Sequence, residues 1–119
     1  MSMTDKIKKG KEAEQLAADF LTDKGFRILE RNFRHKHCEI DLIAMKDQWL
    51  IFVEVKMRSS ADFGQPEIFV NRSKRSHVRY ASRHYIFSRN WMGNIRFDVI
   101  AITQSDKGFD LCHIEDAFY

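Results

Sequence analysis

Several patterns that mark common classes of protein are scarce or missing in this sequence. The two cysteines, Cys38 and Cys112, are too few for a disulfide framework. No glycine-rich phosphate loop is present, which argues against nucleotide hydrolysis of the P-loop kind. The longest uninterrupted apolar run, Trp49–Val53, is far shorter than the roughly 20 residues of a membrane-spanning helix. The N-terminus lacks the apolar segment of a signal peptide, so we expect a soluble cytoplasmic protein that does not bind a membrane.

The sequence nevertheless contains enough apolar material for a folded domain. Its 119 residues are 44% apolar and include ten Phe, three Tyr and two Trp, which is typical of an ordinary globular core. There is no internal repeat, no low-complexity segment and no linker, and the only proline is Pro66. These features predict a single domain over residues 1–119.

The order of the expected elements predicts an α/β fold. Apolar residues at helical spacing predict a first helix over about residues 5–24, which Gly25 would end. A second helix is expected over residues 71–88, with Asn71 as its N-cap, and residues 59–66 have the composition of a loop. The expected strands cover residues 26–33, 39–45, 49–56 and 95–103, with a short last strand at 111–114. This order predicts a mixed β-sheet flanked by α-helices.

Charged residues interrupt two strand-like segments that are otherwise apolar. Glu39 and Asp41 precede Leu42, and Glu54 and Lys56 follow the apolar run at Trp49. Ionised carboxylates are rarely buried unless they are paired or bind a metal ion. Metal-assisted chemistry is therefore one interpretation. The other is a surface strand whose charges form cross-strand ion pairs, Glu39–Lys56 among them.

A two-residue loop at Asp47-Gln48, the commonest hairpin connection, would fix how these segments pair. Asp41 would then lie opposite Glu54, and Glu39 opposite Lys56, because paired residues lie at equal distances from the turn. All four charged side chains would project from one side of the sheet. The opposite side would collect the apolar residues Ile40, Leu42, Ala44, Ile51, Val53 and Val55.

Such an arrangement would suit a divalent cation. Two opposed carboxylates repel each other unless a cation bridges them. Mg²⁺ takes oxygen ligands and is often held by one or two carboxylates together with phosphate oxygens of a substrate. Asp41 and Glu54 would hold Mg²⁺ or Mn²⁺, and Lys56 would orient or deprotonate the attacking water or stabilise charge on the phosphate.

The second expected helix lies in a strongly basic segment. Residues 71–97 contain seven Lys or Arg and no Asp or Glu. Four arginines fall within about 80° of one another on a helical wheel: Arg72, Arg75, Arg79 and Arg83. Three apolar residues lie on the opposite side: Val78, Ala81 and Tyr85. We interpret this arginine ridge as a nucleic-acid-binding surface. Arg58 would extend it near the expected acidic pair, and Lys74 would lie closer to the side of the helix that packs on the sheet. A solvated charged face is the alternative.

The sequence resembles the YraN-type family of small bacterial proteins along nearly its whole length. The matching motifs are the segments 39–44 (EIDLIA) and 52–58 (FVEVKMR), Phe63-Gly64 and Arg96–Val99. The family is similar to the restriction-endonuclease-like PD-(D/E)xK nucleases, which include archaeal Holliday-junction resolvases. The resemblance implies a restriction-endonuclease-like fold and a metal-dependent nuclease site. Since junction resolvases act as dimers, it also implies a homodimer.

The resemblance assigns roles to five residues. Asp41 and Glu54 correspond to the acidic pair that binds the metal, Lys56 to the motif lysine, and Val55 would lend its backbone carbonyl to the ion. Glu14 corresponds to a glutamate that the resolvases contribute from their first helix, and it borders the apolar stripe of the expected helix.

Two positions depart from the family pattern without removing a charge from the site. Cys38 stands where the family usually has glycine, and Ile40 stands at the superfamily's nominal proline. A zinc site can also be assembled from His35, His37 and Cys38 with Cys112-His113, but the spacing matches none of the usual paired-ligand patterns.

We therefore expect a Mg²⁺- or Mn²⁺-dependent endonuclease that cleaves branched or otherwise structured DNA. The main alternative is a non-catalytic nucleic-acid-binding module that keeps the nuclease fold. A third hypothesis is an adaptor whose arginine ridge binds an acidic protein.

Overall fold

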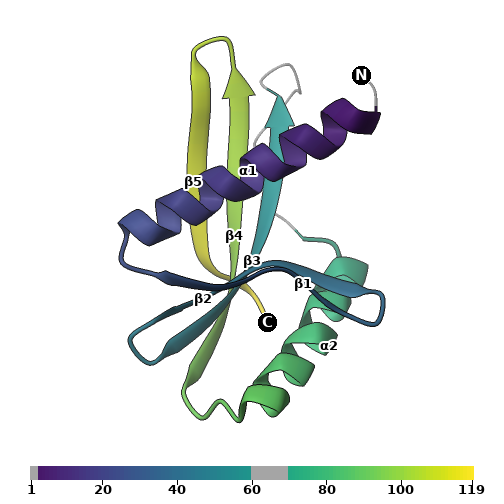
Figure 1. Cartoon of the computed structure of the whole chain (residues 1–119), viewed down its shortest axis with the longest axis vertical. Coiled ribbons are helices and arrows are strands. Elements are labelled where there is room, and N and C mark those ends of the chain that lie inside the picture. Colours follow the sequence, from purple (N-terminus) through teal and green to yellow (C-terminus); the bar gives the residue numbers. More distant parts are fainter. Residues whose placement is uncertain (1–2, 60–69) are drawn as a thin grey trace.

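The structure is a computed structural model that describes residues 3–59 and 70–119, and the side chains of residues 10–57 and 70–119. Its elements are α1 (Met3–Asp23), β1 (Arg27–His35), β2 (Cys38–Lys46), β3 (Trp49–Ser59), α2 (Arg72–Arg89), β4 (Asn94–Ser105) and β5 (Gly108–Phe118). The strands form one sheet in the order β1-β2-β3-β4-β5 (Figure 1). Only β3 and β4 are parallel, and α2 connects them. The predicted mixed α/β fold is confirmed.

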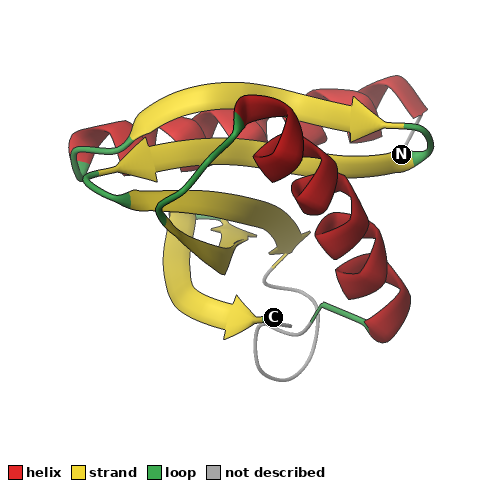
Figure 2. Cartoon of the chain, turned by 90° about the horizontal axis from the view of Figure 1, so that it is seen from below, coloured by secondary structure: helices red, strands yellow, loops and turns green. Residues whose placement is uncertain are grey.

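The two helices cover opposite faces of the sheet (Figure 2). On one face, α1 buries Ala13, Ala17 and Leu21 against the sheet. On the other face, α2 buries Val78 and Tyr85 against a second apolar cluster. The sheet is strongly twisted, so that β1 and β2 run across the direction of β4 and β5 (Figure 1). The structure thus has three layers: helix, sheet and helix.

Local sequence explains where both helices stop or start. α1 ends where Gly25 takes a φ of 94°, and the Phe26 N–H then donates to the Leu21 carbonyl at 2.9 Å. α2 begins at Asn71, whose side chain accepts a hydrogen bond from the Lys74 N–H at 2.8 Å. Both predicted helix signals are therefore confirmed. Of the loop predicted over residues 59–66, Ser59 is instead the last residue of β3, and residues 60–66 lie outside the described residues.

The β2–β3 hairpin has the predicted register, but only in its inner part. Pairing runs from Lys46↔Trp49 to Leu42↔Val53 and stops there. Asp41 and Glu54 are therefore not cross-strand partners in the ladder, and neither are Glu39 and Lys56. The prediction of direct opposition for these two pairs was wrong.

The predicted apolar face of the hairpin was also wrong at Ile40. The cluster under α1 contains Leu42, Ala44, Ile51 and Val53, and the partly buried Val55 packs against it. Ile40 instead belongs to the cluster under α2. Asn32 in the neighbouring strand has a φ of 51° and falls between the pairs Arg31↔Leu42 and Phe33↔Ile40. A left-handed residue at that point reverses the alternation of side chains, so Ile40 and Leu42 face opposite layers.

No helix among the described residues is long and apolar enough to span a membrane.

The last strand is longer than expected: β5 covers Gly108–Phe118 rather than residues 111–114. Most of its side chains are exposed or half-buried, which explains why the apolar pattern indicated only its middle.

Candidate functional site

The hairpin splits at Asp41, and this split brings the acidic residues together. The Asp41 side chain accepts a hydrogen bond from the Val55 N–H, with 2.8 Å between N and Oδ2. In the register of the hairpin, that N–H would otherwise bond to the backbone of Ile40. The carboxylate thus takes the place of a backbone acceptor, and β2 and β3 separate beyond this point.

Glu54 is the most strongly perturbed group of the site. Its side chain is only 4% exposed, and its Oε2 lies 3.4 Å from Lys74 Nζ. Its Oε1 is buried and has no hydrogen-bond partner among the described residues. Burial and the negative charge of Asp41 raise the pKa of Glu54 to about 8. Burial also raises the pKa of Asp41, although the hydrogen bond from Val55 opposes that rise.

Glu14 joins this cluster from α1, on the position that the sequence predicted. Burial raises its pKa; the Asn32 side chain offsets part of the effect, and the charges of Asp41 and Glu39 add to it. The structure thus places Asp41 beside Glu54 and brings Glu14 within electrostatic range of Asp41, and it adds Asn32 and Lys74. Asn32 was missed as a member of the site, although it is one of the residues that match the family pattern and Asn is the residue type that most often takes a left-handed backbone outside glycine.

Lys56 lies two residues beyond Glu54 on β3 and is half-buried. Glu39 forms an ion pair with Arg34 of β1 at 3.3 Å, not with Lys56. Within the described part of the chain, no acidic side chain comes within ion-pair distance of Lys56 Nζ. The cross-strand ion pair Glu39–Lys56 that a purely structural interpretation predicted is therefore absent.

The arginine ridge of α2 is formed only in part. Arg72 and Arg83 are exposed and Arg75 is half-buried, while the opposite side of the helix is buried as predicted. Arg79, however, donates hydrogen bonds to the Tyr119 carbonyl and to Ser76 Oγ. The side chain of Arg58 lies outside the described residues. The part of the ridge available to a ligand is therefore Arg72, Arg75 and Arg83.

A second buried carboxylate, Asp98 of β4, was not predicted as part of any site. Arg96 Nε and NH2 donate to it at 2.8 and 2.9 Å, His113 Nε2 at 2.7 Å and the Asp116 N–H at 3.0 Å. Burial alone would raise the pKa of Asp98, but the hydrogen bonds from His113, Arg96 and Asp116 outweigh it and hold the pKa below its ordinary value. Because every acceptor position is used, this group is a structural one.

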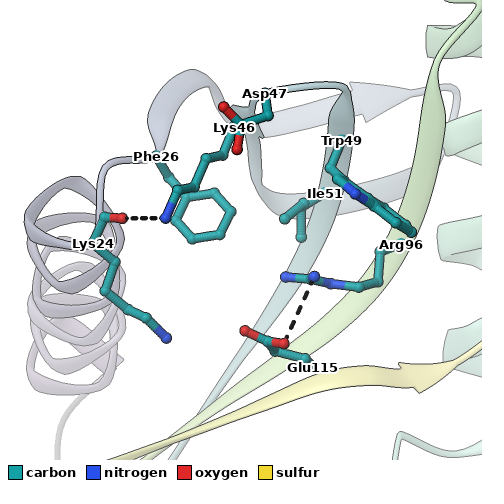
Figure 3. A pocket seen from close by; sticks show the side chains of 8 residues that line it. All are labelled: Lys24, Phe26, Lys46, Asp47, Trp49, Ile51, Arg96 and Glu115. Carbon is teal, nitrogen blue, oxygen red and sulfur yellow. Dashed lines mark hydrogen bonds and ion pairs between the residues drawn. The ribbon is translucent and has the colours of Figure 1, made fainter.

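A pocket of about 230 Å³ lies at the other end of β3, near the β2–β3 turn (Figure 3). Its lysines and arginine already have partners: Lys46 Nζ donates to the Lys24 carbonyl at 2.8 Å, and Arg96 pairs with Glu115 at 3.7 Å. None of the predicted site residues lines it. The pocket therefore does not belong to the acidic cluster.

The zinc site considered from the sequence is not formed in that combination. His113 is hydrogen-bonded to Asp98 and packs on Phe20 under α1, and Cys112 is exposed on β5. The side chains at the start of β2 lie instead in the layer of α2, where Cys38 joins the second apolar cluster. The two halves of the predicted ligand set are thus on different faces of the sheet.

The fold and the site define a small α/β protein with a partly buried acidic cluster where a β-hairpin splits. The model of the uncharacterised protein family UPF0102 matches residues 13–102, and the chain belongs to this family. The UPF0102 protein FP2501 of Flavobacterium psychrophilum is 46% identical over 110 residues, 92% of each chain. The UPF0102 protein THEYE_A1950 of Thermodesulfovibrio yellowstonii is 44% identical over 114 residues, which cover 96% of this chain and 98% of the relative. A UPF0102 protein of Alkaliphilus oremlandii is 42% identical over 114 residues, covering 92% and 96% respectively.

Proposed function

We propose that the protein is a Mg²⁺- or Mn²⁺-dependent nuclease of the restriction-endonuclease-like PD-(D/E)xK type, acting on branched or otherwise structured DNA. The observation that carries this proposal is the buried Glu54 Oε1, which has no hydrogen-bond partner among the described residues and lies beside the carboxylate of Asp41. Burying such an oxygen costs free energy unless a ligand uses it. A cation is the ligand that would satisfy both carboxylates.

The donor atoms at the split fit a hard divalent ion. Asp41 accepts from the Val55 N–H through its Oδ2 and also interacts with the Glu54 carboxyl, whose Oε1 has no partner among the described residues. An ion between the two carboxyls would therefore contact oxygen atoms of both. In a strand the N–H and C=O of one residue point to the same side, so the Val55 carbonyl also points toward Asp41. Carboxylate and carbonyl oxygens are the ligands that Mg²⁺ and Mn²⁺ prefer. Once bound, the ion would polarise the scissile phosphate and lower the pKa of a water ligand.

The remaining residues of the site would act on the substrate and on water. Lys56 would orient the attacking water or take its proton, because it follows Glu54 on the same face of β3. Lys74 would attract the phosphate, since its ammonium group already lies 3.4 Å from a carboxylate of the site. Glu14 would hold a water or a second ion from the side of α1. Arg72, Arg75 and Arg83 would bind the DNA backbone at a distance from the cut.

Cleavage of labelled four-way junction and flap DNA by the purified protein tests this proposal. With Mg²⁺ or Mn²⁺ we expect cleavage that EDTA abolishes, and a loss of at least about 100-fold in both Asp41→Asn and Lys56→Ala. Asp47→Asn is the matched control, because Asp47 is exposed at the β2–β3 turn and belongs to no part of the acidic cluster. Equal residual cleavage in all three variants would trace the activity to a contaminant and contradict the proposal.

The second candidate function is a non-catalytic nucleic-acid-binding module. It is favoured by α2, which contains no acidic residue along its 18 positions. Binding measured at graded salt should weaken steeply as salt rises. The double variant Arg75→Ala/Arg83→Ala should reduce that slope by about two, whereas Arg89→Ala, whose side chain pairs with Glu30, should change it less. Binding without metal-dependent cleavage would support this candidate, and no DNA binding at low salt would instead favour the acidic protein partner.

A further inference from the structure

Histidine is unevenly distributed in this protein. Four of its five histidines lie around the β1–β2 turn and α2: His35, His37, His77 and His84. Two of them, His35 and His84, stack on each other with ring centroids 3.6 Å apart. The other two, His37 and His77, approach at right angles, with their centroids 5.9 Å apart. Perpendicular rings can direct one nitrogen each toward a common point, which stacked rings cannot.

Cys38 completes a group of three donor atoms at that point. The ligand atoms of His37, Cys38 and His77 all lie within 4.8 Å of one another. In a tetrahedral zinc site, Zn–N bonds of roughly 2.0–2.1 Å and Zn–S bonds of roughly 2.3 Å place the donor atoms roughly 3.5 Å apart. Small side-chain rotations are therefore enough to close the group around an ion.

Burial gives the group an inner and an outer side. Cys38 is 3% exposed, His77 is half-buried and His37 is exposed. A thiol at the base with two imidazoles above it leaves a path for an ion from solvent. It also leaves a fourth coordination position on the outside.

The chemistry of the donors selects a different metal from that of the acidic cluster. Two imidazole nitrogens and one thiolate are borderline-soft ligands, which suit Zn²⁺ and not Mg²⁺. The carboxylates of Asp41 and Glu54 provide only hard oxygen. The two groups are thus chemically separate, although they lie near one another on β2.

We propose that His37, Cys38 and His77 form a Zn²⁺ site with three protein ligands and one water or external ligand. On binding, the Cys38 thiol loses its proton to solvent and the two imidazoles bind as neutral ligands. The ion joins the β1–β2 turn to α2, whose residues also pack against each other at this point. This inference is independent of the proposed nuclease function.

Titration of the reduced, metal-free full-length protein with Co²⁺ tests the site. Tetrahedral Co²⁺ absorbs in the visible range, and a thiolate ligand adds a charge-transfer band in the near ultraviolet. We expect one Co²⁺ per chain with both signals and displacement of Co²⁺ by Zn²⁺. A ratio of one ion per two chains would overturn an intramolecular site.

Two pairs of matched variants identify the ligands. Cys38→Ser should abolish the charge-transfer band, whereas Cys112→Ser, at the exposed second cysteine, should keep it. His77→Ala should weaken Zn²⁺ binding by at least about tenfold, whereas His84→Ala, also on α2, should not.

Circular dichroism and urea unfolding in EDTA identify any variant that does not fold. If Cys38→Ser fails that check, the His77 and His84 pair alone decides. Equal Zn²⁺ affinity in those two variants, or a band lost with Cys112 rather than Cys38, would overturn the proposal.

Discussion

The protein contains two kinds of buried carboxylate, and their surroundings are opposite. Asp98 receives four hydrogen bonds, from Arg96, His113 and Asp116, and its pKa lies below the ordinary value. Glu54 has one ion pair at 3.4 Å and one oxygen without a partner, and its pKa is raised to about 8. A fully satisfied carboxylate stabilises the fold, whereas an incompletely satisfied one weakens it unless something binds there. The contrast separates a structural group from a candidate functional one within the same sheet.

The largest effect is expected at the structural carboxylate. Asp98→Asn leaves the Arg96 guanidinium partly buried without its ion-pair partner, and we expect a loss of about 3–5 kcal/mol in the free energy of unfolding. Urea unfolding at pH 7 measures it. Asp110→Asn, at an exposed position on β5, should change the unfolding free energy by less than about 0.5 kcal/mol. If Asp98→Asn lowered the free energy of unfolding no more than Asp110→Asn does, Asp98 would not be a stabilising carboxylate.

Removing the charge of Glu54 should raise the free energy of unfolding, whereas removing that of Asp98 lowers it. In the absence of divalent ions, Glu54→Gln should stabilise the protein at pH 8 by on the order of 1–2 kcal/mol, because it removes a buried charge. The folded pKa of about 8 exceeds the ordinary glutamate pKa of 4.5, so the native state binds the extra proton and wild-type stability falls as pH rises between these values.

The pH dependence provides the check on that sign. Urea unfolding in EDTA from pH 4 to pH 9 should give a smaller decrease for Glu54→Gln than for the wild type, and the two should converge near pH 4. Glu12→Gln, at an exposed position on α1, should follow the wild type throughout. A Glu54→Gln variant that is less stable at pH 8 would show that the ionised carboxylate is satisfied after all.

A bound divalent ion should satisfy Glu54, as hydrogen bonds satisfy Asp98, and so should stabilise the protein. At a Mg²⁺ concentration ten times its Kd, the wild type should gain about 1.4 kcal/mol in unfolding free energy. At one fixed Mg²⁺ concentration, the gain should be larger at pH 8.5 than at pH 6.5, since protons compete with the ion for Glu54 and raise its apparent Kd at the lower pH. Thermal unfolding with and without Mg²⁺ measures this gain, which Asp41→Asn should abolish and Asp47→Asn should retain. An equal gain in both variants would place the ion elsewhere.

The sequence predicted the elements and the inner register of the hairpin because both depend on local signals. Gly25 and Asn71 set helix ends, and the two-residue turn at Asp47-Gln48 sets the pairing. The end of the ladder was not predictable in this way. A carboxylate that competes with the backbone for the Val55 N–H is a tertiary event, and the left-handed Asn32 in the next strand displaces Ile40 to the other layer.

The candidate site was predicted where the hairpin pattern or the family resemblance connects its residues, as for Asp41, Glu54 and Glu14, and missed where neither does, as for Asn32. Asp41 and Glu54 belong to one hairpin, so alternation and turn length indicated their proximity. The Asp98 network depends on His113 and Asp116 from a strand whose exposed side chains obscured its pattern. His77 is separated from Cys38 by two strands and a helix start, and no sequence spacing connects them.

The hydrogen bond between Asp41 and Val55 gives the protein an internal spectroscopic reporter. The amide proton of Val55 points at a carboxylate whose charge changes with pH and with any bound cation. Its chemical shift in a nitrogen–proton correlation spectrum should therefore follow the charge state of the cluster, while the amides of the inner hairpin, such as those of Leu50 and Phe52, should not. One backbone resonance can thus be used to titrate the cluster without a substrate.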